Sequence, residues 1–290
     1  MTDQMFFIDY IMFETFFSLF LFVVPPSTFP TDLAMRLPSP FVWENQRTSF
    51  PRVEAEAFVV IDAVSHETVL ARSADRIVPY ASMSKLMTAI VTRHTLDLGQ
   101  GVETPLAPLS RPGVREIVQR GDLLTVRQLL SLMLVASAND AAQVLADAGG
   151  GAQFVAAMNH EALAQGFTSM SFSNPHGLDE TNFGVNRGSV RDLALLFTLA
   201  YQDPELRPIL ESSRVAFTSA RSKRYDEYTT NQAKEDPELG IFAGKTGTTD
   251  RAQECIVVRL RAKDRIFIVV LVGSSDRYTD LTSLINWLKA

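Results

Sequence analysis

Apolar residues along the chain follow a strand pattern, then a helical pattern, and then a strand pattern again. Residues 57–63 and 68–72 are β-branched and apolar runs separated by residues 64–67, which predicts a hairpin of two strands. From residue 83 onwards, apolar side chains recur every three or four residues, the spacing of a helix that buries one stripe. The same spacing predicts further helices over residues 125–134, 140–148, 152–165 and 189–201.

The last part of the chain returns to the strand pattern. It predicts strands over residues 241–245, 254–261 and 265–273, a tight turn at 262–264 and a final helix over 281–289. Strands at both ends with a long helical insert imply an antiparallel sheet built from distant segments, with a helical subdomain beside it. We therefore expect an α+β fold with three layers, and an active-site cleft between the sheet and the helices.

The N-terminal part of the chain has a different composition. Residues 6–24 are dominated by Phe and Leu, which favours a signal peptide or a membrane anchor over residues 1–24 and an extracytoplasmic location. Asp9 and Glu14 would be costly in a bilayer, so an extension from a wrongly assigned start remains the alternative. Residues 25–51 carry six prolines and predict an extended linker, which leaves residues 52–290 as the catalytic domain.

Composition excludes several classes of partner. The 27 basic and 33 acidic residues give a net charge of -6 with no dense basic block, so nucleic acid is a poor partner. Cys255 is the only cysteine, which rules out an intramolecular disulfide and indicates a packed thiol on a strand. We expect no metal and no cofactor, because the histidines lack ligand spacing and are interpreted as turn or surface residues: His66, His94, His160 and His176.

Three short motifs carry candidate chemistry. They are Ser82-Met83-Ser84-Lys85, Ser137-Ala138-Asn139 and Lys245-Thr246-Gly247. Alone, each has an ordinary interpretation: a helix cap with a solvated lysine, a cap at Asn139 for the next helix, or a lysine that protects a sheet edge. Their expected places favour catalysis, because Ser82 begins a buried helix, Ser137 lies between two helices and Lys245 ends a strand.

The chain resembles the serine DD-carboxypeptidase family of penicillin-binding proteins, the low-molecular-weight group that shares its fold with class A β-lactamases. The resemblance covers residues 57–287 and is carried by YASMSKLMT at 80–88, SANDAA at 137–142, NPHGL at 174–178 and GKTGTT at 244–249. It implies hydrolysis of D-Ala-D-Ala bonds in peptidoglycan stem peptides through an acyl-serine intermediate. It also implies that β-lactam antibiotics acylate the same serine.

The residues themselves explain how Ser82 could be activated. A serine hydroxyl needs a base, and Lys85 lies one helical turn along on the same face. Burial and the like charge of Lys245 would lower the pKa of Lys85 and allow it to be neutral. The N–H of Ser82, at a helix N-terminus, can help to form an oxyanion hole.

The resemblance assigns the remaining roles. It implies that Ser137 relays a proton to the departing amine, that Asn139 bonds the substrate backbone and that Lys245 supplies positive charge. The Thr248 N–H would be the second oxyanion donor. The residues expected to contact substrate are Thr246, Gly247, Thr248, Thr249 and Arg277, of which Thr249 and Arg277 would bind the terminal carboxylate.

Two departures and two rival functions remain open. The chain has Gln253 where the family usually has glycine, and its ending soon after Trp287 resembles endopeptidase-type members, so cross-bridge cleavage is as open as D-alanine removal. A β-lactamase needs a deacylating acid. Glu161 and Glu180 lack the spacing that class A enzymes use, and Asp179 is interpreted as a loop residue. A penicillin sensor would keep the motifs without turnover.

Overall fold

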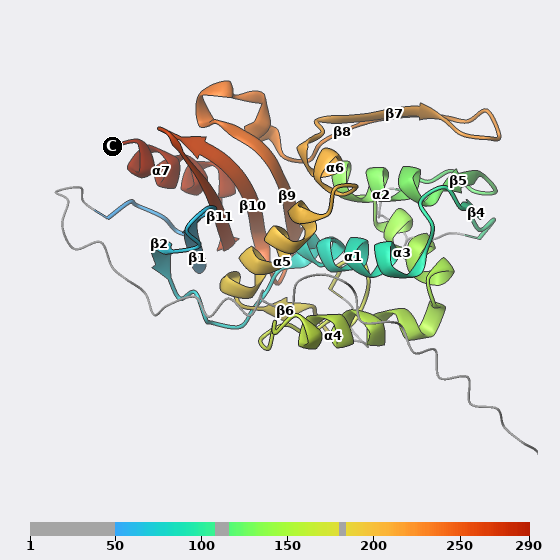
Figure 1. The fold of residues 1–290 in the computed structure, drawn as a ribbon, viewed down its shortest axis with the longest axis horizontal. Coiled ribbons are helices and arrows are strands. Elements are labelled where there is room, and N and C mark those ends of the chain that lie inside the picture. The colour runs from blue at the N-terminus through green and yellow to red at the C-terminus, as the bar shows by residue number, and fades with distance from the viewer. Residues whose placement is uncertain (1–49, 108–115, 180–183) are drawn as a thin grey trace, which may run out of the picture. The chain divides into compact units, whose positions relative to one another are not determined.

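The computed structural model describes residues 50–107, 116–179 and 184–290 (Figure 1). The predicted segment 1–24 lies outside these residues, and of the predicted linker 25–51 only residues 50 and 51 are described. The domain boundary at residue 52 therefore stays a prediction. Among the described helices, none combines the length and apolar character that crossing a bilayer requires.

A five-stranded antiparallel sheet joins the two ends of the described chain. Its strand order is β2-β1-β11-β10-β9, so the N-terminal hairpin pairs directly with the last strand. In that pairing Val59 lies opposite Val270. The strands are β1 (Ala57–Asp62), β2 (Thr68–Arg72), β9 (Ile241–Thr249), β10 (Gln253–Ala262) and β11 (Arg265–Ser274). The predicted hairpin and the sheet assembled from distant segments are confirmed.

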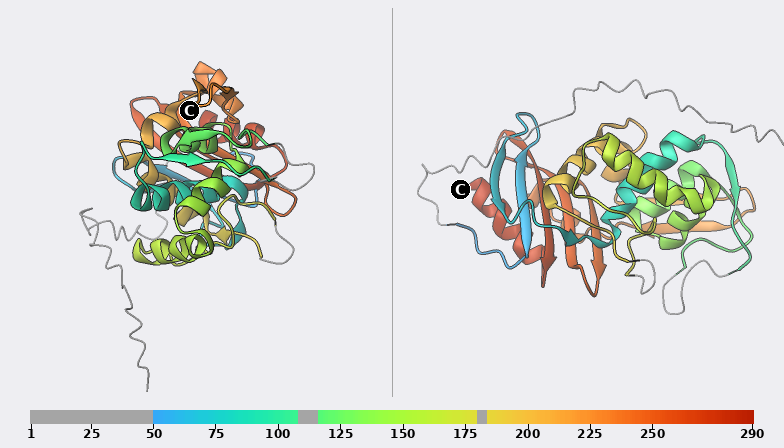
Figure 2. Two further views of the ribbon diagram at one scale, coloured as in Figure 1. Left: turned by 90° about the vertical axis from the view of Figure 1, so that its right-hand side faces the viewer. Right: turned by 90° about the horizontal axis from the view of Figure 1, so that it is seen from below.

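Both faces of the sheet are covered, which explains its nearly continuous apolar strands. Alternate residues of β1 enter two separate cores: Val59 packs toward the helical insert, whereas Phe58 packs toward the C-terminal helix. Figure 2 shows the sheet between that helix on one side and the helical part on the other. The predicted three layers are therefore present.

The helical insert contains the predicted helices at nearly the predicted places. The elements are η2 (Ala81–Ser84), α1 (Lys85–Thr95), α2 (Val126–Val135), α3 (Asn139–Ala148), η3 (Gly151–Gln153), α4 (Phe154–Ala164), α5 (Val190–Gln202) and α6 (Arg207–Glu211). Side chains set two of the starts. Thr125 and Gln128 form a capping box before α2, and the Ser189 hydroxyl accepts a hydrogen bond from the N–H of Asp192 before α5.

Short strand pairs and turns, which the apolar pattern does not predict, connect these helices. They are β3 (Val78–Pro79) with β6 (Arg187–Gly188), β4 (Gly101–Glu103) with β5 (Leu123–Thr125), β7 (Arg214–Thr218) with β8 (Arg224–Tyr228), and the turns η4 (Gln232–Glu235) and η5 (Pro237–Leu239). The β7–β8 hairpin lies beside α2 (Figure 1). Its strands are largely exposed, so they lack the buried pattern that would have predicted them.

The last helix, α7 (Arg277–Lys289), begins four residues before the predicted start. Asp276 caps it by accepting hydrogen bonds from the N–H groups of Tyr278 and Thr279. Within α7, buried Asp280 accepts a hydrogen bond from Ser274 Oγ at 2.6 Å and another from the Ala55 N–H at 2.8 Å. One carboxylate therefore ties the start of the described domain to its final helix.

Candidate active site

Ser82 and Lys85 lie together on one turn at the start of α1. Ser82 is in the 3₁₀ turn η2, and Lys85 is the first residue of α1. The chain therefore presents both side chains to the same side, with Lys85 Nζ 2.9 Å from Ser82 Oγ. Ser82 is nearly buried and Lys85 is fully buried. This is the spatial relation that a serine nucleophile and its base require.

Lys85 has three acceptors around its amine. Besides Ser82, Nζ donates to Asn139 Oδ1 at 2.7 Å and to the backbone carbonyl of His176 at 2.5 Å. Burial lowers the pKa of Lys85 well below its ordinary value, and the nearby charge of Lys245 lowers it further, while Asp140 opposes the shift. The direction expected from the sequence, and its two causes, are confirmed.

The His176 carbonyl was not among the predicted site groups. His176 lies in a bend, as the turn interpretation expected, but it is buried, so the surface interpretation is wrong. Gly177 explains how this loop comes so close. Its φ is +85°, and a Cβ built on it would lie 2.1 Å from the Ala81 carbonyl oxygen. The NPHGL segment at residues 174–178, which resembles the family, could have pointed to this loop. A backbone acceptor, however, leaves no side-chain signature in the sequence.

Two asparagines hold this loop against η2. Asn174 Oδ1 accepts a hydrogen bond from the Gly177 N–H at 2.6 Å. The buried side chain of Asn186 donates through Nδ2 to Ser84 Oγ at 2.7 Å and to the Asn174 carbonyl at 2.9 Å. The loop and η2 are therefore one hydrogen-bonded unit, which fixes the His176 carbonyl relative to Lys85.

Ser137 meets Lys245 across the site. Ser137 lies in the predicted loop between α2 and α3 with a φ of +58°, and its Oγ accepts a hydrogen bond from Lys245 Nζ at 2.7 Å. The prediction that Lys245 ends a strand is wrong, because β9 continues to Thr249. Burial lowers the pKa of Lys245 to about 7, with a further contribution from the Arg277 charge.

Asn139 is the first residue of α3, and Ala138 before it occupies the cap position. The alternative that it merely caps the following helix is therefore wrong. Its Oδ1 is directed to Lys85, as described above. The next residue, buried Asp140, accepts hydrogen bonds from the N–H groups of Ile117 at 2.5 Å and Val118 at 2.7 Å. Together they connect the α2–α3 corner to the amine and to the neighbouring loop.

Strand β9 passes directly beside η2, the turn that contains Ser82. A Cβ built on Gly247 would lie 2.9 Å from the Ser82 nitrogen and 3.2 Å from the Tyr80 carbonyl oxygen. The glycine of the third motif is therefore required for close approach of two backbones, rather than for turn chemistry. Thr246 Oγ1 lies 2.5 Å from Thr230 Oγ1, and Thr248 is exposed at the end of the strand.

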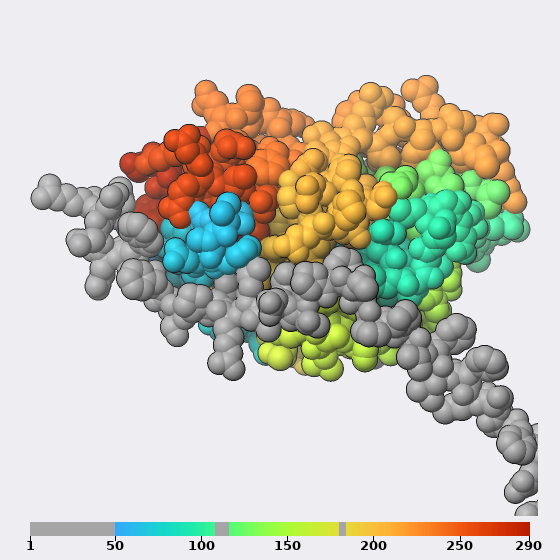
Figure 3. All heavy atoms as spheres, viewed as in Figure 1, coloured from blue at the N-terminus to red at the C-terminus, as the bar shows by residue number. Residues whose placement is uncertain are grey.

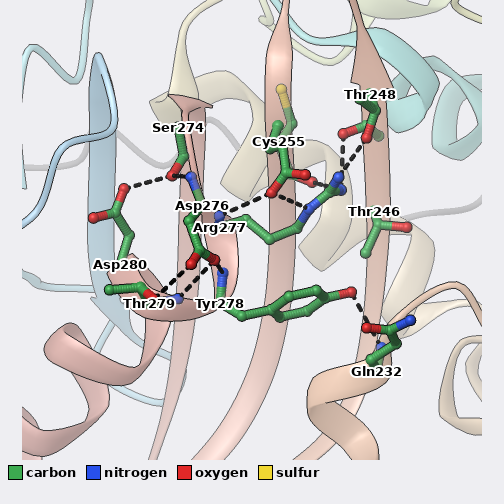
Figure 4. A network of polar contacts seen from close by, with 12 residues as sticks. Gln232, Thr246, Thr248, Cys255, Ser274, Asp276, Arg277, Tyr278, Thr279 and Asp280 are labelled. Carbon is green, nitrogen blue, oxygen red and sulfur yellow. Dashed lines mark hydrogen bonds and ion pairs between the residues drawn. The ribbon is translucent and has the colours of Figure 1, made fainter.

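Arg277 reaches the same strand from α7 (Figure 4). Its Nη1 donates to the Gly247 and Cys255 carbonyls, both at 2.9 Å, and Nη2 donates to Thr248 Oγ1. Nε forms a charge-assisted bond with Glu254 at 3.1 Å. Arg277 thus lies next to the predicted carboxylate site, but most of its donors already bind the protein. The sequence did not predict this bracing of β9.

The turn after β9 contains the departure from the family wording. Thr249 Oγ1 accepts a hydrogen bond from the Ala252 N–H at 3.1 Å, which closes the turn. Gln253 follows with a φ of +52°, a conformation that favours glycine. This chain therefore carries left-handed strain at residue 253, and the Gln253 side chain is exposed.

We expect Gln253→Gly to raise the free energy of unfolding by about 0.5–1 kcal/mol, because relieving left-handed strain outweighs the added chain entropy. Urea unfolding measures the change. Exposed Gln100 has no positive φ, so Gln100→Gly is the matched control and should lose stability. Equal losses in the two variants would show that residue 253 carries no strain.

The structure also shows the positions of Cys255 and Asp179, which were interpreted from the sequence. Cys255 is fully buried on β10, as expected, and burial raises the pKa of its thiol to about 12. Asp179 accepts a hydrogen bond from the Arg251 N–H at 3.0 Å, and Glu180 lies outside the described residues. The described ranges contain no cluster of three or more His, Cys, Asp or Glu side chains suited to a metal ion.

Comparison with known proteins places this geometry in a family. The family model for D-alanyl-D-alanine carboxypeptidase matches residues 44–276, which include all three motifs. The chain belongs to this family. It is 31% identical over 245 residues to the D-alanyl-D-alanine endopeptidase of Pseudomonas aeruginosa, with 80% of this chain and 76% of that protein covered. It is 30% identical over 225 residues to the D-alanyl-D-alanine carboxypeptidase DacB2 of Mycobacterium tuberculosis, with 77% and 76% covered.

Solved structures confirm the expected D-alanyl-D-alanine carboxypeptidase fold. The D-alanyl-D-alanine carboxypeptidase of M. tuberculosis superposes with a TM-score of 0.76 at 27% identity, covering 83% of this chain and 92% of that one. Penicillin-binding protein D2 of Listeria monocytogenes, in its cefotaxime-bound form, gives 0.72 at 26% identity, covering 83% and 99%. The resemblance inferred from the motifs is thereby confirmed for both family and fold.

Proposed function

We propose that the chain is a serine-type DD-peptidase that hydrolyses D-Ala-D-Ala bonds, or D-Ala-containing cross-bridges, of peptidoglycan stem peptides. The observation that carries the proposal is the convergence of Ser82, Lys85 and Asn139 with Ser137 and Lys245, joined by the hydrogen bonds described above. A nucleophile with a buried amine at 2.9 Å meets the needs of acyl transfer. Membership of the family supports the substrate class.

In the proposed first step, neutral Lys85 accepts the proton of Ser82 as Oγ attacks the substrate carbonyl carbon. The developing oxyanion would be stabilised by the N–H groups of Ser82 and Thr248. When the carbon–nitrogen bond breaks, the proton that Lys85 accepted passes to the leaving amine through Ser137, which already bonds Lys245, and Lys85 is neutral again. Water then hydrolyses the ester and regenerates Ser82.

Substrate contacts are proposed for Asn139, the edge of β9 and Arg277. Within the described residues the Asn139 Nδ2 makes no hydrogen bond, so it can donate to the substrate backbone while Oδ1 holds Lys85. β9 from Thr246 to Thr249 offers a strand edge with the charge of Lys245 beside it. Arg277 would favour binding of the terminal carboxylate of the substrate through its positive charge, which lies behind Thr248.

The pH dependence of turnover should reflect two lysines with opposite requirements. Lys85 must be neutral to act as a base, whereas Lys245 must be charged to attract a carboxylate. Raising pH through the lowered pKa of Lys85 deprotonates the base and increases acylation. Raising pH above the pKa of about 7 for Lys245 removes the charge that attracts a carboxylate, so KM should rise. Lys245→Arg keeps its charge at every working pH and should abolish the alkaline rise in KM. A rise that persists unchanged in this variant would exclude Lys245 as its source.

The position of Glu161 argues against a β-lactamase function. This carboxylate pairs with His94 in the last turn of α1 at 3.6 Å, whereas Ser82 precedes the first turn. The 11 residues of α1 span about 16 Å, too far for direct deacylation at Ser82. We therefore expect a trapped, slowly released β-lactam acyl group rather than rapid turnover of a chromogenic cephalosporin.

The function is tested by mass spectrometry of stem pentapeptide and of cross-linked dimer incubated with the purified protein. We expect loss of D-alanine, opening of the cross-link, or both. The two relatives above carry one name of each kind, so the ratio of the two rates decides between carboxypeptidase and endopeptidase. Penicillin labelling without change in either substrate would instead indicate a sensor. Such substrates lie outside the cytoplasmic membrane, and association through residues 6–24 is part of the proposal.

A further inference from the structure

A basic cavity lies away from the catalytic residues, where α5 and α6 meet the sheet. Its volume is about 390 Å³. The lining comes from the C-terminal end of α5, the start of α6 and neighbouring strand ends, and it includes Tyr201, Arg207, Phe242, Arg259 and Arg261. Figure 3 views the face on which α5 and α6, in gold, adjoin the orange and red strands. On β9, Phe242 precedes Lys245 by about 10 Å, so this cavity is separate from the active site.

The cavity is positively charged. Three arginines line it, and no lining residue is Asp or Glu. Other arginines of the domain have acidic partners, as in the ion pairs Arg93–Asp203 and Arg127–Glu205. In the described part of the chain, no carboxylate lies within ion-pair distance of Arg207, Arg259 or Arg261. Like charges gathered in this way repel one another unless an anion neutralises them.

Arg259 carries the most direct sign of a missing partner. Its Nε atom is buried and has no hydrogen-bond acceptor among the described residues. A buried guanidinium N–H without an acceptor is costly, so natural structures almost always supply one. Burial lowers the pKa of Arg259 and the like charge of Arg207 adds to this, while Tyr201 and the Glu211 carboxylate oppose the shift. Glu211 is the nearby carboxylate, and it accepts the hydroxyl hydrogen bond of Tyr201 instead.

Tyr201 holds two of the guanidinium groups in place. The guanidinium carbons (Cζ) of Arg259 and Arg207 lie 4.6 Å and 5.1 Å, respectively, from the centre of its ring. Arg207 also donates through Nε to the Tyr201 carbonyl at 3.0 Å. Stacking on an aromatic ring fixes the planes of the guanidinium forks and leaves their outer N–H groups available. The cavity is therefore a preformed set of donors rather than a group of mobile surface charges.

We propose that this cavity binds a phosphate-type oxyanion, either inorganic phosphate or a small phosphomonoester. Guanidinium forks match phosphate and carboxylate oxygens. Three arginines around one cavity favour phosphate, because a doubly charged group with several acceptor oxygens neutralises more of them than a single carboxylate. The proposal does not depend on the peptidase function.

Thermal unfolding in millimolar sodium phosphate, compared with sodium chloride of equal ionic strength, tests the proposal. Phosphate at about 100 times its dissociation constant should raise the melting temperature of the wild-type protein by roughly 5–10 °C. Arg259→Gln should remove this increment, and without phosphate it should be at least as stable as the wild type, because an unpaired buried charge is gone. A stability loss independent of phosphate would show that Arg259 only packs on Tyr201, and would overturn the proposal.

Two further variants complete the design. Arg261 is exposed, so Arg261→Gln leaves the core intact and should weaken the phosphate response. Arg224 is also exposed and lies outside the cavity, so Arg224→Gln should respond as the wild type does. An equal response in all variants would overturn the proposal. A far-UV circular dichroism spectrum identical to that of the wild type confirms that each variant is folded.

Calorimetric titration distinguishes the possible sources of the anion. Inorganic phosphate and glycerol 3-phosphate should bind the wild type, and Arg259→Gln should weaken both at least tenfold. Acetate should bind more weakly than phosphate, and equal binding would assign the cavity to carboxylates and overturn the phosphate proposal. Binding only to phosphatidylglycerol vesicles, with none to either soluble phosphate, would also overturn it in favour of a membrane surface.

Discussion

Lys85→Ala should slow acylation of the protein by a β-lactam about 10²–10⁴-fold, the range that positioned general bases contribute. Lys85 Nζ lies within hydrogen-bond reach of Ser82 Oγ, and its lowered pKa makes the neutral form accessible. Stopped-flow labelling with a fluorescent penicillin measures the rate. Acylation at the wild-type rate would show that another group accepts the Ser82 proton.

A second substitution separates the base from the packing. Lys85 is fully buried, so alanine leaves a cavity, whereas Lys85→Met keeps the volume and removes the amine. Both variants should acylate slowly, and Met should retain more stability. Lys234 is the matched control, since burial lowers its pKa to about 8 but it donates to the Glu211 and Ser212 carbonyls. Lys234→Ala should acylate normally.

Gly177→Ala should reduce acylation at least about 100-fold, because misplacement of a catalytic group by about 1 Å has effects of that size. The new Cβ would lie 2.1 Å from the Ala81 carbonyl oxygen, so either the loop or the Ser82 turn must move. Movement of the loop also removes the His176 carbonyl from Lys85. The acylation rate and the free energy of unfolding are both measured.

Gly166 provides the matched control for backbone strain. Its φ is +78°, close to the +85° of Gly177, but no atom lies within 4 Å of a Cβ built on it. Gly166→Ala should therefore lose only the left-handed strain, roughly 1–2 kcal/mol of stability, and acylate at the normal rate. If Gly177→Ala behaves in the same way, the close approach to Ala81 has no catalytic role.

Much of the fold could be predicted because its core elements have strong periodic patterns. The β1–β2 hairpin and α1 bury regular stripes, and each was predicted to within a few residues. The β7–β8 hairpin has few buried residues and gave no such signal. The start of α7 depends on the Asp276 cap, whose residues are polar and precede the apolar stripe used for the prediction.

The site was predictable where side chains carry the chemistry and not where backbone does. Ser82, Lys85 and Lys245 were found from motif wording, and the structure brings them together with Ser137 and Asn139. The His176 carbonyl could not be predicted, since any residue supplies a carbonyl and only the fold directs it. The length of β9 beyond Lys245 was missed for a related reason. Thr248 and Thr249 pair with β10, but they lack the apolar character of a buried strand.

Glycines show how backbone contact enters the sequence indirectly. Gly247 and Gly177 both lie against η2, one from β9 and one from the loop before α5, and a Cβ on either would meet the backbone of residues 80–82. Their presence in the motif wording therefore reports the packing of three distant segments around Ser82. This packing, rather than any single side chain, forms the site.

Peptide mapping by mass spectrometry, after brief incubation with benzylpenicillin, tests the central claim most directly. We predict one acyl group per protein, on the peptide that contains Ser82, with none on Ser82→Ala. An unmodified protein, or an adduct on any other residue, would contradict the assignment of Ser82 as the nucleophile and the mechanism built on it.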